Sequence, residues 1–158
     1  MINRKSPRRI GFDYSSGYIY FVTINCQDKH SFLGKISISD DSNQMVLSEI
    51  GRIAATKINE ISSHHPGVDV IDYVVMPNHI HMLISLQNQI KDSSLSTIIG
   101  SYKSGVSREV RQTFPGLDLW QRSFWDHVIR DERDLLMHSE YINANIDRWH
   151  KDKYFIKE

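Results

Sequence analysis

Two apolar segments on either side of a proline–asparagine pair constrain the fold of this chain more than any other feature. Residues 68–76 and 79–86 are rich in Val, Ile, Leu and Met, and each has the length of one β-strand. Pro77 and Asn78 between them are residues that favour a tight turn. The pattern therefore predicts two strands that lie side by side and are joined by that turn.

Two further segments have strand character. Residues 18–26 are β-branched and aromatic and predict a buried strand. Residues 34–39 predict a weaker strand, which a polar turn at residues 40–43 follows. An aromatic segment at residues 119–125 lies further along the chain, before the last predicted helix.

Apolar residues at helical spacing predict three helices. The first begins at Ser48, a plausible N-cap, and ends near residues 62–65, and the second runs from Leu95 to Phe114. The third covers about residues 131–149. The order of strands and helices predicts an α+β fold, in which helices cover one face of an antiparallel sheet and a last helix is appended.

Length and composition fit a single domain spanning residues 1–158, which is 40% hydrophobic and 24% charged. Cys26 is the only cysteine, so an intramolecular disulfide is impossible and a reducing, intracellular setting is expected. No apolar run approaches the ~20 residues that a membrane span needs. We therefore expect a cytoplasmic protein without a membrane partner.

The formal charge is balanced, with 19 basic and 19 acidic residues. A general nucleic-acid binder is usually more basic, so the balance argues against extensive neutralisation of phosphates. Basic residues nevertheless cluster at residues 4–9 and again at Lys103, Arg108 and Arg111. A local basic groove is therefore compatible with the composition.

His79 and His81 form the sharpest local motif. Side chains alternate between the two faces of a strand, so both imidazoles should leave one face while Ile80 packs into the other. Two imidazoles a few ångströms apart can hold one divalent ion, zinc included. The same spacing also fits a solvated or hydrogen-bonded pair, and a third ligand would have to come from elsewhere, with the last helix as the place to look.

Tyr141 and Asn145 lie four residues apart in the predicted last helix and therefore share one of its faces. That face borders the apolar stripe of the helix, and His138 lies on the same flank. A phenol can act as a nucleophile, and an amide oxygen can ligate a metal. A tyrosine on a helix flank can equally be a packing residue, so periodicity alone does not assign it a role.

Four segments carry a family resemblance. Residues 73–84 contain histidine, a bulky hydrophobic residue and histidine, and residues 141–145 read Tyr-Ile-Asn-Ala-Asn. Residues 11–24 match an opening strand, and residues 120–130 match an aromatic and basic segment. In this order, between residues 9 and 149, they resemble the single-tyrosine HUH transposases, especially the REP-associated tyrosine transposase branch.

The resemblance implies a ferredoxin-like fold that is usually dimeric and acts on single-stranded DNA near hairpins. It implies that His79 and His81 are metal ligands, that Asn145 is a third ligand, and that Tyr141 is a nucleophile forming a 5′-phosphotyrosine link. Relatives use Mg²⁺ or Mn²⁺, ions that suit a phosphate-binding site with imidazole and oxygen ligands, although imidazoles alone do not exclude zinc.

One position departs from the family's pattern. Relatives commonly have a proline after this asparagine, whereas Ile146 follows Asn145 here. Because proline ends helices and isoleucine does not, the last helix is predicted to continue to Trp149.

Contacts to DNA are expected from basic and aromatic side chains. Basic groups would meet phosphates, and tryptophans would stack on unpaired bases. Tryptophans equally fit the core, and exposed basic residues are often only solvated. The candidate set is Lys103, Arg108, Arg111, Arg122, Arg130, Trp120 and Trp125.

Two other functions remain open at this point. A domesticated hairpin-DNA-binding protein would keep the fold and lose catalysis, but the four intact site residues argue against it. A metal-dependent phosphodiesterase would use His79 and His81 with water as the nucleophile, and it would give Tyr141 no necessary role.

Overall fold

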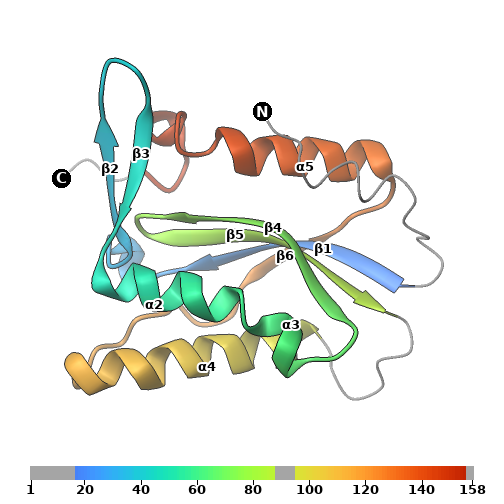
Figure 1. Ribbon diagram of the computed structural model, residues 1–158, viewed down its shortest axis with the longest axis horizontal. Coiled ribbons are helices and arrows are strands. Elements are labelled where there is room, and N and C mark those ends of the chain that lie inside the picture. The colour runs from blue at the N-terminus through green and yellow to red at the C-terminus, as the bar shows by residue number, and fades with distance from the viewer. Residues whose placement is uncertain (1–16, 88–94, 156–158) are drawn as a thin grey trace.

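A four-stranded antiparallel sheet with the order β4-β5-β1-β6 forms the centre of the molecule. The computed structural model describes residues 17–87 and 95–155. The basic cluster at residues 4–9 lies outside the described residues. The strands of the sheet are β1 (Gly17–Asn25), β4 (Val68–Met76), β5 (His79–Gln87) and β6 (Trp125–Val128) (Figure 1).

The β4–β5 hairpin confirms the pair of strands predicted from the two apolar segments. Met76 pairs with His79 across the turn, and the pairing continues to Val68 and Leu86. β5 lies between β4 and β1, and eight of its nine residues are buried. A strand with neighbours on both sides and elements on both faces needs an apolar sequence, which explains its composition.

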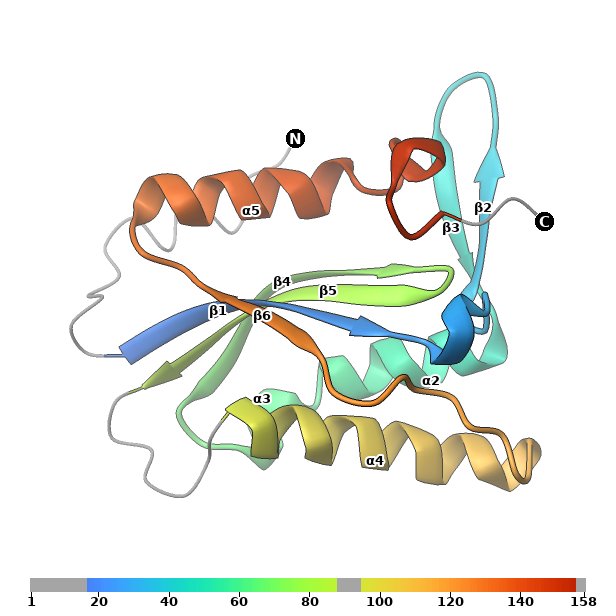
Figure 2. The ribbon, with the colours of Figure 1, turned by 180° about the vertical axis from the view of Figure 1, so that it is seen from behind.

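Helices cover both faces of the sheet. α2 (Glu49–Ile58), α3 (Ile61–His64) and α4 (Leu95–Thr113) lie on one face, and α5 (Glu132–Ala144) lies on the other (Figures 1 and 2). The predicted N-cap is confirmed, because the Ser48 hydroxyl accepts a hydrogen bond from the Gly51 N–H at 3.0 Å. The larger core lies under α2 and α4, and a smaller one lies under α5.

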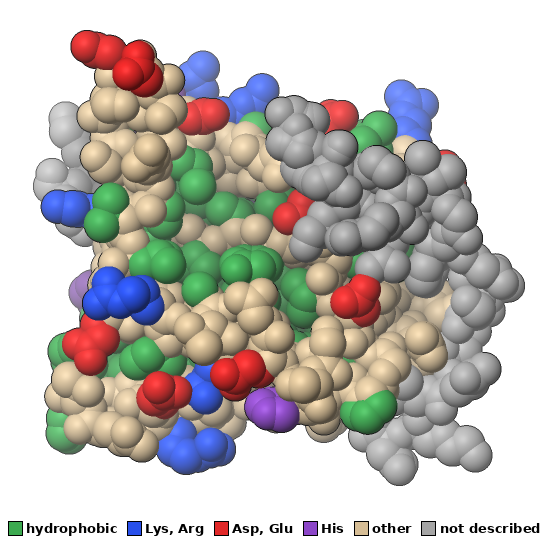
Figure 3. All heavy atoms as spheres, viewed as in Figure 1, with side chains coloured by type: hydrophobic (Ala, Val, Ile, Leu, Met, Phe, Trp, Pro, Cys, Tyr) green, Lys and Arg blue, Asp and Glu red, His purple; other side chains and the backbone are tan. Residues whose placement is uncertain are grey.

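The fourth strand of the sheet, β6, comes from a segment in which the sequence pattern predicted no strand. β2 (Gly34–Ile38) and β3 (Asn43–Leu47) pair only with each other in a separate hairpin, and β6 from the aromatic segment completes the sheet. β2 and β3 bury no residue completely, and their alternation reflects an arm that packs against the cores through one face, with Ile36, Met45 and Leu47. Acidic side chains gather at the tip of this arm (Figure 3).

The prediction that the last helix continues to Trp149 is wrong. α5 ends at Ala144, Asn145 is its C-cap, and a short 3-10 helix, η2 (Trp149–Lys151), follows a turn. Trp149 turns inward, and its ring lies 6.1 Å from that of His79. This inward packing outweighs the helical preference of the local sequence and directs the following residues back across β5.

Cys26 is buried, and burial raises the pKa of its thiol to about 12, which makes it unreactive. Among the described residues, no helix has both the length and the apolar character for crossing a membrane.

Candidate metal and nucleophile site

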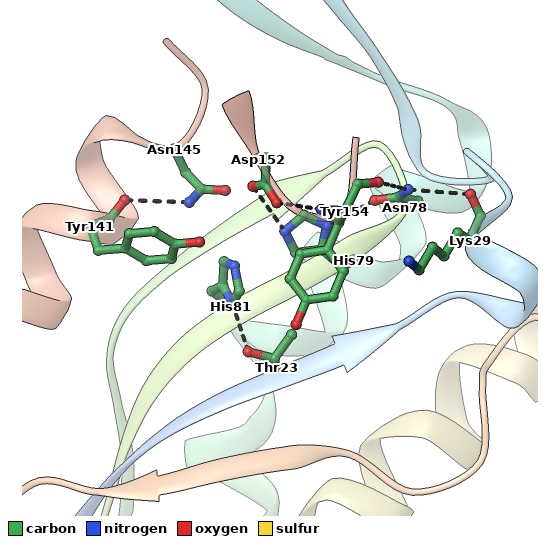
Figure 4. Close-up of polar contacts among 9 residues, drawn as sticks. All are labelled: Thr23, Lys29, Asn78, His79, His81, Tyr141, Asn145, Asp152 and Tyr154. Atoms are coloured by element: carbon green, nitrogen blue, oxygen red, sulfur yellow. Dashed lines mark hydrogen bonds and ion pairs between the residues drawn. The ribbon is translucent and has the colours of Figure 1, made fainter. Parts of the chain in front are cut away.

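His79 and His81 project from one face of β5, the face that α5 covers (Figure 4), while Ile80 enters the opposite core. The predicted alternation is therefore confirmed. Both histidines are buried: 0% of the surface of His79 and 2% of the surface of His81 is exposed. Their ring centroids are 4.6 Å apart. This burial excludes the alternative that the two histidines are a solvated pair.

Asn78 fixes the protonation of His79. Its amide group donates to the carbonyls of Lys29 at 3.2 Å and Tyr154 at 2.7 Å (Figure 4). The amide oxygen of Asn78 is then left to accept from His79 Nδ1 at 2.8 Å. Because neutral imidazole carries one proton, His79 Nε2 presents a lone pair, which is the form that binds a metal.

Thr23 holds His81 in a similar way. Thr23 lies opposite His81 on β1, and its hydroxyl is 2.9 Å from His81 Nδ1. Burial, and then the nearby Lys153, lower the pKa of His81 to about 3. Burial and then the charge of His81 lower the pKa of His79 well below its ordinary value. Both rings are therefore neutral at physiological pH.

Four buried side-chain polar atoms have no hydrogen-bond partner among the described residues, and three of the four belong to the predicted metal ligands. These three are Nε2 of His79, Nε2 of His81 and Oδ1 of Asn145. Buried polar atoms are nearly always paired, so three unpaired atoms with lone pairs in one place fit a bound cation. Asn145 occupies the C-cap of α5, and its amide nitrogen donates to the Tyr141 carbonyl at 3.5 Å.

Asp152 is a further candidate ligand that the sequence did not indicate. Its Oδ2 lies 3.7 Å from His79 Nε2, and only 3% of its side chain is exposed. Burial raises the pKa of this carboxyl, which a nearby cation would offset. His79, His81 and Asp152 together place one ligand atom each within 4.8 Å of one another. No periodic pattern marks Asp152, because the turn after α5 brings it here.

Tyr141 lies beside this group of ligands. Its ring is 5.3 Å from that of His81 and 6.0 Å from that of Phe21, and 39% of the residue is exposed. Its hydroxyl is turned toward the space between Asn145 and His81 (Figure 4). Burial raises the pKa of the phenol, which the Asn145 amide partly offsets. The phenol is therefore protonated at neutral pH and needs activation before it can attack.

An open cavity of about 1070 Å³ adjoins these side chains. Tyr141, His81 and Asn145 line it, which exposes both the phenol and the ligand group to a large substrate. Its other lining residues include three cationic side chains, suited to phosphate groups. These are Arg148, Lys151 and Lys153.

The residues expected to contact DNA do not form one surface. Lys103, Arg108, Arg111 and Trp120 line a shallow cavity of about 440 Å³ on α4, on the far side of the sheet from the histidines. Lys103 Nζ donates to the carbonyls of Gln121 and Ser123, both at 2.8 Å, so it also fixes the loop before β6.

The two tryptophans of the candidate set differ. Trp120 is buried, and its indole N–H donates to the Lys103 carbonyl at 3.2 Å. Trp125 on β6 is 69% exposed, so it is the tryptophan available for stacking. Arg122 and Arg130 are exposed on the loops before and after β6.

Comparisons with known proteins agree with the fold and show the family. An uncharacterised protein of Haemophilus influenzae is 29% identical and matches 98% of this chain and 94% of its own length. A putative REP-associated tyrosine transposase of the same organism is 28% identical over 84% of this chain and 72% of its own length. A solved REP-associated tyrosine transposase, bound to a REP hairpin, has a TM-score of 0.57 with 22% identity and covers 82% of this chain and 67% of its own.

The family model described as "Transposase IS200 like" matches residues 35–145, which contain the histidine pair, Tyr141 and Asn145. This match confirms the resemblance that the motifs carry. The chain belongs to the IS200-like transposase family.

Proposed function

We propose that this protein is a metal-dependent endonuclease and transposase that cleaves and rejoins single-stranded DNA at hairpin-containing repeats through Tyr141. The observation that carries the proposal is the group of three unpaired, buried lone-pair atoms beside an exposed phenol. The names of the relatives, one of them solved with a REP hairpin, support DNA hairpins as the substrate class.

His79, His81 and Asn145 would hold the metal, with Asp152 as a further oxygen ligand. The mixture of imidazole and oxygen donors and a phosphate substrate favour Mg²⁺ or Mn²⁺. When bound, the cation withdraws charge from a non-bridging phosphate oxygen and so offsets the repulsion that an attacking nucleophile meets. The buried, neutral imidazoles suit this role because they need not lose a proton first.

Tyr141 performs the substitution at phosphorus. Its oxygen forms a bond to the phosphorus as the bond to the 3′ oxygen of the leaving strand breaks, and the phenol proton is lost as the 3′ oxygen gains one. The product is a 5′-phosphotyrosine and a free 3′-hydroxyl. Because a phosphodiester is exchanged for a phosphodiester, a second 3′-hydroxyl can reverse the step without ATP, which hydrolysis by water would not allow.

A single chain brings all the proposed site residues together. Tyr141 on α5 lies against His81 on β5 of the same chain. The homodimer that the family resemblance implies would then carry two complete sites, rather than sharing residues between subunits. Mixing Tyr141→Phe with His79→Ala protein should restore no cleavage, whereas restored cleavage would show that the tyrosine serves the partner's histidines.

The decisive experiment is incubation of the full chain with a 5′-labelled and a 3′-labelled hairpin oligonucleotide in Mg²⁺ or Mn²⁺, followed by denaturing electrophoresis. We expect a covalent protein–DNA adduct that Tyr141→Phe abolishes. Tyr154 provides a sharp comparison because it lines the same cavity and its ring is 4.4 Å from that of His79. An adduct that disappears with Tyr154→Phe and persists with Tyr141→Phe would overturn the assignment.

The same experiment separates the other functions. Cleavage without any adduct would indicate a phosphodiesterase that uses water, and binding without cleavage in either metal would indicate a domesticated DNA-binding protein. Tyr18→Phe is the matched control, because Tyr18 is 55% exposed on β1 and does not line the cavity.

A further inference from the structure

A second cluster of metal-ligand side chains lies next to the proposed site but is separate from it. His127 belongs to β6, and Asp134 and His138 belong to the first half of α5. Residues four apart share one face of a helix, so Asp134 and His138 point together toward the neighbouring strand. One ligand atom from each of the three residues lies within 4.8 Å of the others.

The arrangement of the ligand atoms is the basis for an assignment. His127 Nε2 is 2.9 Å from Asp134 Oδ2, and His138 Nδ1 is 3.1 Å from Asp134 Oδ1. The two imidazole rings are stacked, with centroids 4.8 Å apart and an angle of 21° between the planes. Two donors bound at about 2.0–2.1 Å to one ion lie roughly 3.0–3.4 Å from each other. The two nitrogen–oxygen distances are close to this spacing, and the two ring nitrogens lie within 4.8 Å of each other.

We propose that His127, Asp134 and His138 form a zinc site distinct from the Mg²⁺ or Mn²⁺ site of the proposed function. Imidazole nitrogen is a donor that suits zinc better than magnesium, and zinc also takes carboxylate oxygen. The substrate phosphate that favours Mg²⁺ or Mn²⁺ at the proposed site is not part of this cluster. The side chains of His127, Asp134 and His138 are 41%, 16% and 20% exposed, so an ion reaches them without any opening of the backbone. Water completes the coordination.

Hydrogen bonds hold the cluster in the absence of an ion. Asp134 Oδ2 also accepts from the Arg130 N–H at 3.0 Å, and His138 Nδ1 lies 2.9 Å from the Asp134 carbonyl. To bind zinc, each ring nitrogen facing the carboxylate must present its lone pair, so its proton moves to the other ring nitrogen or to solvent. The Arg130 contact can persist, because a carboxylate oxygen has two lone pairs.

The position of the cluster indicates what zinc would do. It joins β6 to α5, and His138 precedes Tyr141 by one helical turn. The Phe21 ring lies 4.7 Å from His138 and 5.0 Å from His81, so an apolar ring stands between the two sites. Zinc here would fix the helix that carries the proposed nucleophile relative to the sheet, without taking part in the reaction.

The test is the number of zinc ions that the full chain retains after dialysis, measured by elemental analysis. We expect one fewer ion in His127→Ala than in wild type, and no loss in His64→Ala, which removes an exposed histidine of α3 on the other face of the sheet. The variant with His79→Ala and His81→Ala should retain one ion in the presence of excess Mg²⁺. An unchanged number in His127→Ala would overturn the proposal and leave the cluster as a hydrogen-bonded cap of α5.

A second measurement does not depend on stoichiometry. Zinc should raise the melting temperature of the His79→Ala/His81→Ala variant, and adding His127→Ala to that variant should remove the increase. If zinc has no effect on the double variant, or the same effect on the triple one, the cluster does not bind zinc.

Discussion

The two histidine–carboxylate clusters contain the same kinds of side chain but differ in burial and in hydrogen bonding. His79, His81 and Asp152 are buried, and both Nε2 atoms lack a hydrogen-bond partner among the described residues. His127 and His138 are partly exposed, and each is hydrogen-bonded to Asp134.

The difference teaches how to distinguish two kinds of polar cluster. The side chains of the His127 cluster hydrogen-bond within the cluster, so the fold is stable without an ion there. The His79 cluster leaves desolvated lone pairs unmatched, which costs stability unless a ligand compensates. We therefore expect the buried cluster to show large effects on function and the half-exposed one to show small effects.

The largest expected effect is on cleavage. His81→Ala should lower the rate of hairpin cleavage by roughly a thousandfold, because a metal ion stabilises the transition state by several kcal/mol. Binding of the hairpin should change little. The initial rate with a labelled oligonucleotide measures this. His127→Ala is the comparison and should lower the rate far less, because His127 is proposed only to hold α5 in place and not to bind the catalytic metal. Equal losses in both variants would mean that the two clusters act as one site.

The next effect concerns metal affinity. Thr23→Val removes the hydroxyl that is 2.9 Å from His81 Nδ1 while keeping the shape of the side chain. Loss of such a supporting hydrogen bond typically lowers metal affinity about 10–100-fold. A Mn²⁺ titration followed by electron paramagnetic resonance measures it. Thr23→Ser retains the hydroxyl and should restore affinity, and a failure to do so would point to packing instead.

The pH dependence of stability should follow the buried cluster. In chelator, the folded-state pKa of His81 is about 3, against an ordinary value of 6.5. Below pH 6.5 the His81 side chain binds a proton in the unfolded chain but not in the folded one, which favours unfolding. The stability that neutral His81 allows is therefore complete above pH 6.5 and is lost as the pH falls toward 3. Between pH 7 and pH 5 the loss is about 2 kcal/mol for this histidine.

Urea unfolding at pH 7 and pH 5 measures that loss, and His81→Gln should reduce it. Asp134 in the other cluster behaves differently. Hydrogen bonds from His127 and from the Arg130 N–H outweigh its burial and lower the pKa of its carboxyl, so its contribution is lost only as the pH falls below about 3.8. An undiminished loss in His81→Gln would show that other groups cause the acid sensitivity.

The smallest effect is expected for His127→Ala in the metal-free protein. The contact between His127 and Asp134 is partly exposed, and exposed contacts of this kind contribute at most about 1 kcal/mol. The free energy of unfolding in urea at pH 7 measures this. A loss of more than twice that amount would place His127 in the structural core of the fold rather than at its edge.

Local patterns were sufficient for much of the fold and for part of the site. The β4–β5 hairpin, the Ser48 cap and the shared face of His79 and His81 follow from alternation and turn residues, which act over a few positions. The shared face of Tyr141 and Asn145 follows from helical periodicity in the same way.

Features that depend on tertiary packing were not predictable. β6 has four residues and pairs with β1 although its own sequence shows no clear alternation. The end of α5 depends on the inward packing of Trp149, and Asp152 reaches His79 only because the chain turns there. The spacing of Asp134 and His138 is visible in the sequence, but their meeting with His127 requires the unpredicted strand β6.

The burial of β5 has a dynamic consequence. Its neighbours on both sides and the elements on both faces shield its backbone amides from solvent, so we expect His79 and His81 to lie on a rigid part of the molecule. α5 covers the sheet from outside, and its phenol is partly exposed. We therefore expect any adjustment between resting and reactive geometries to fall on Tyr141 in the last turn of α5, beyond the part of the helix that the His127 cluster joins to the sheet, rather than on the imidazoles.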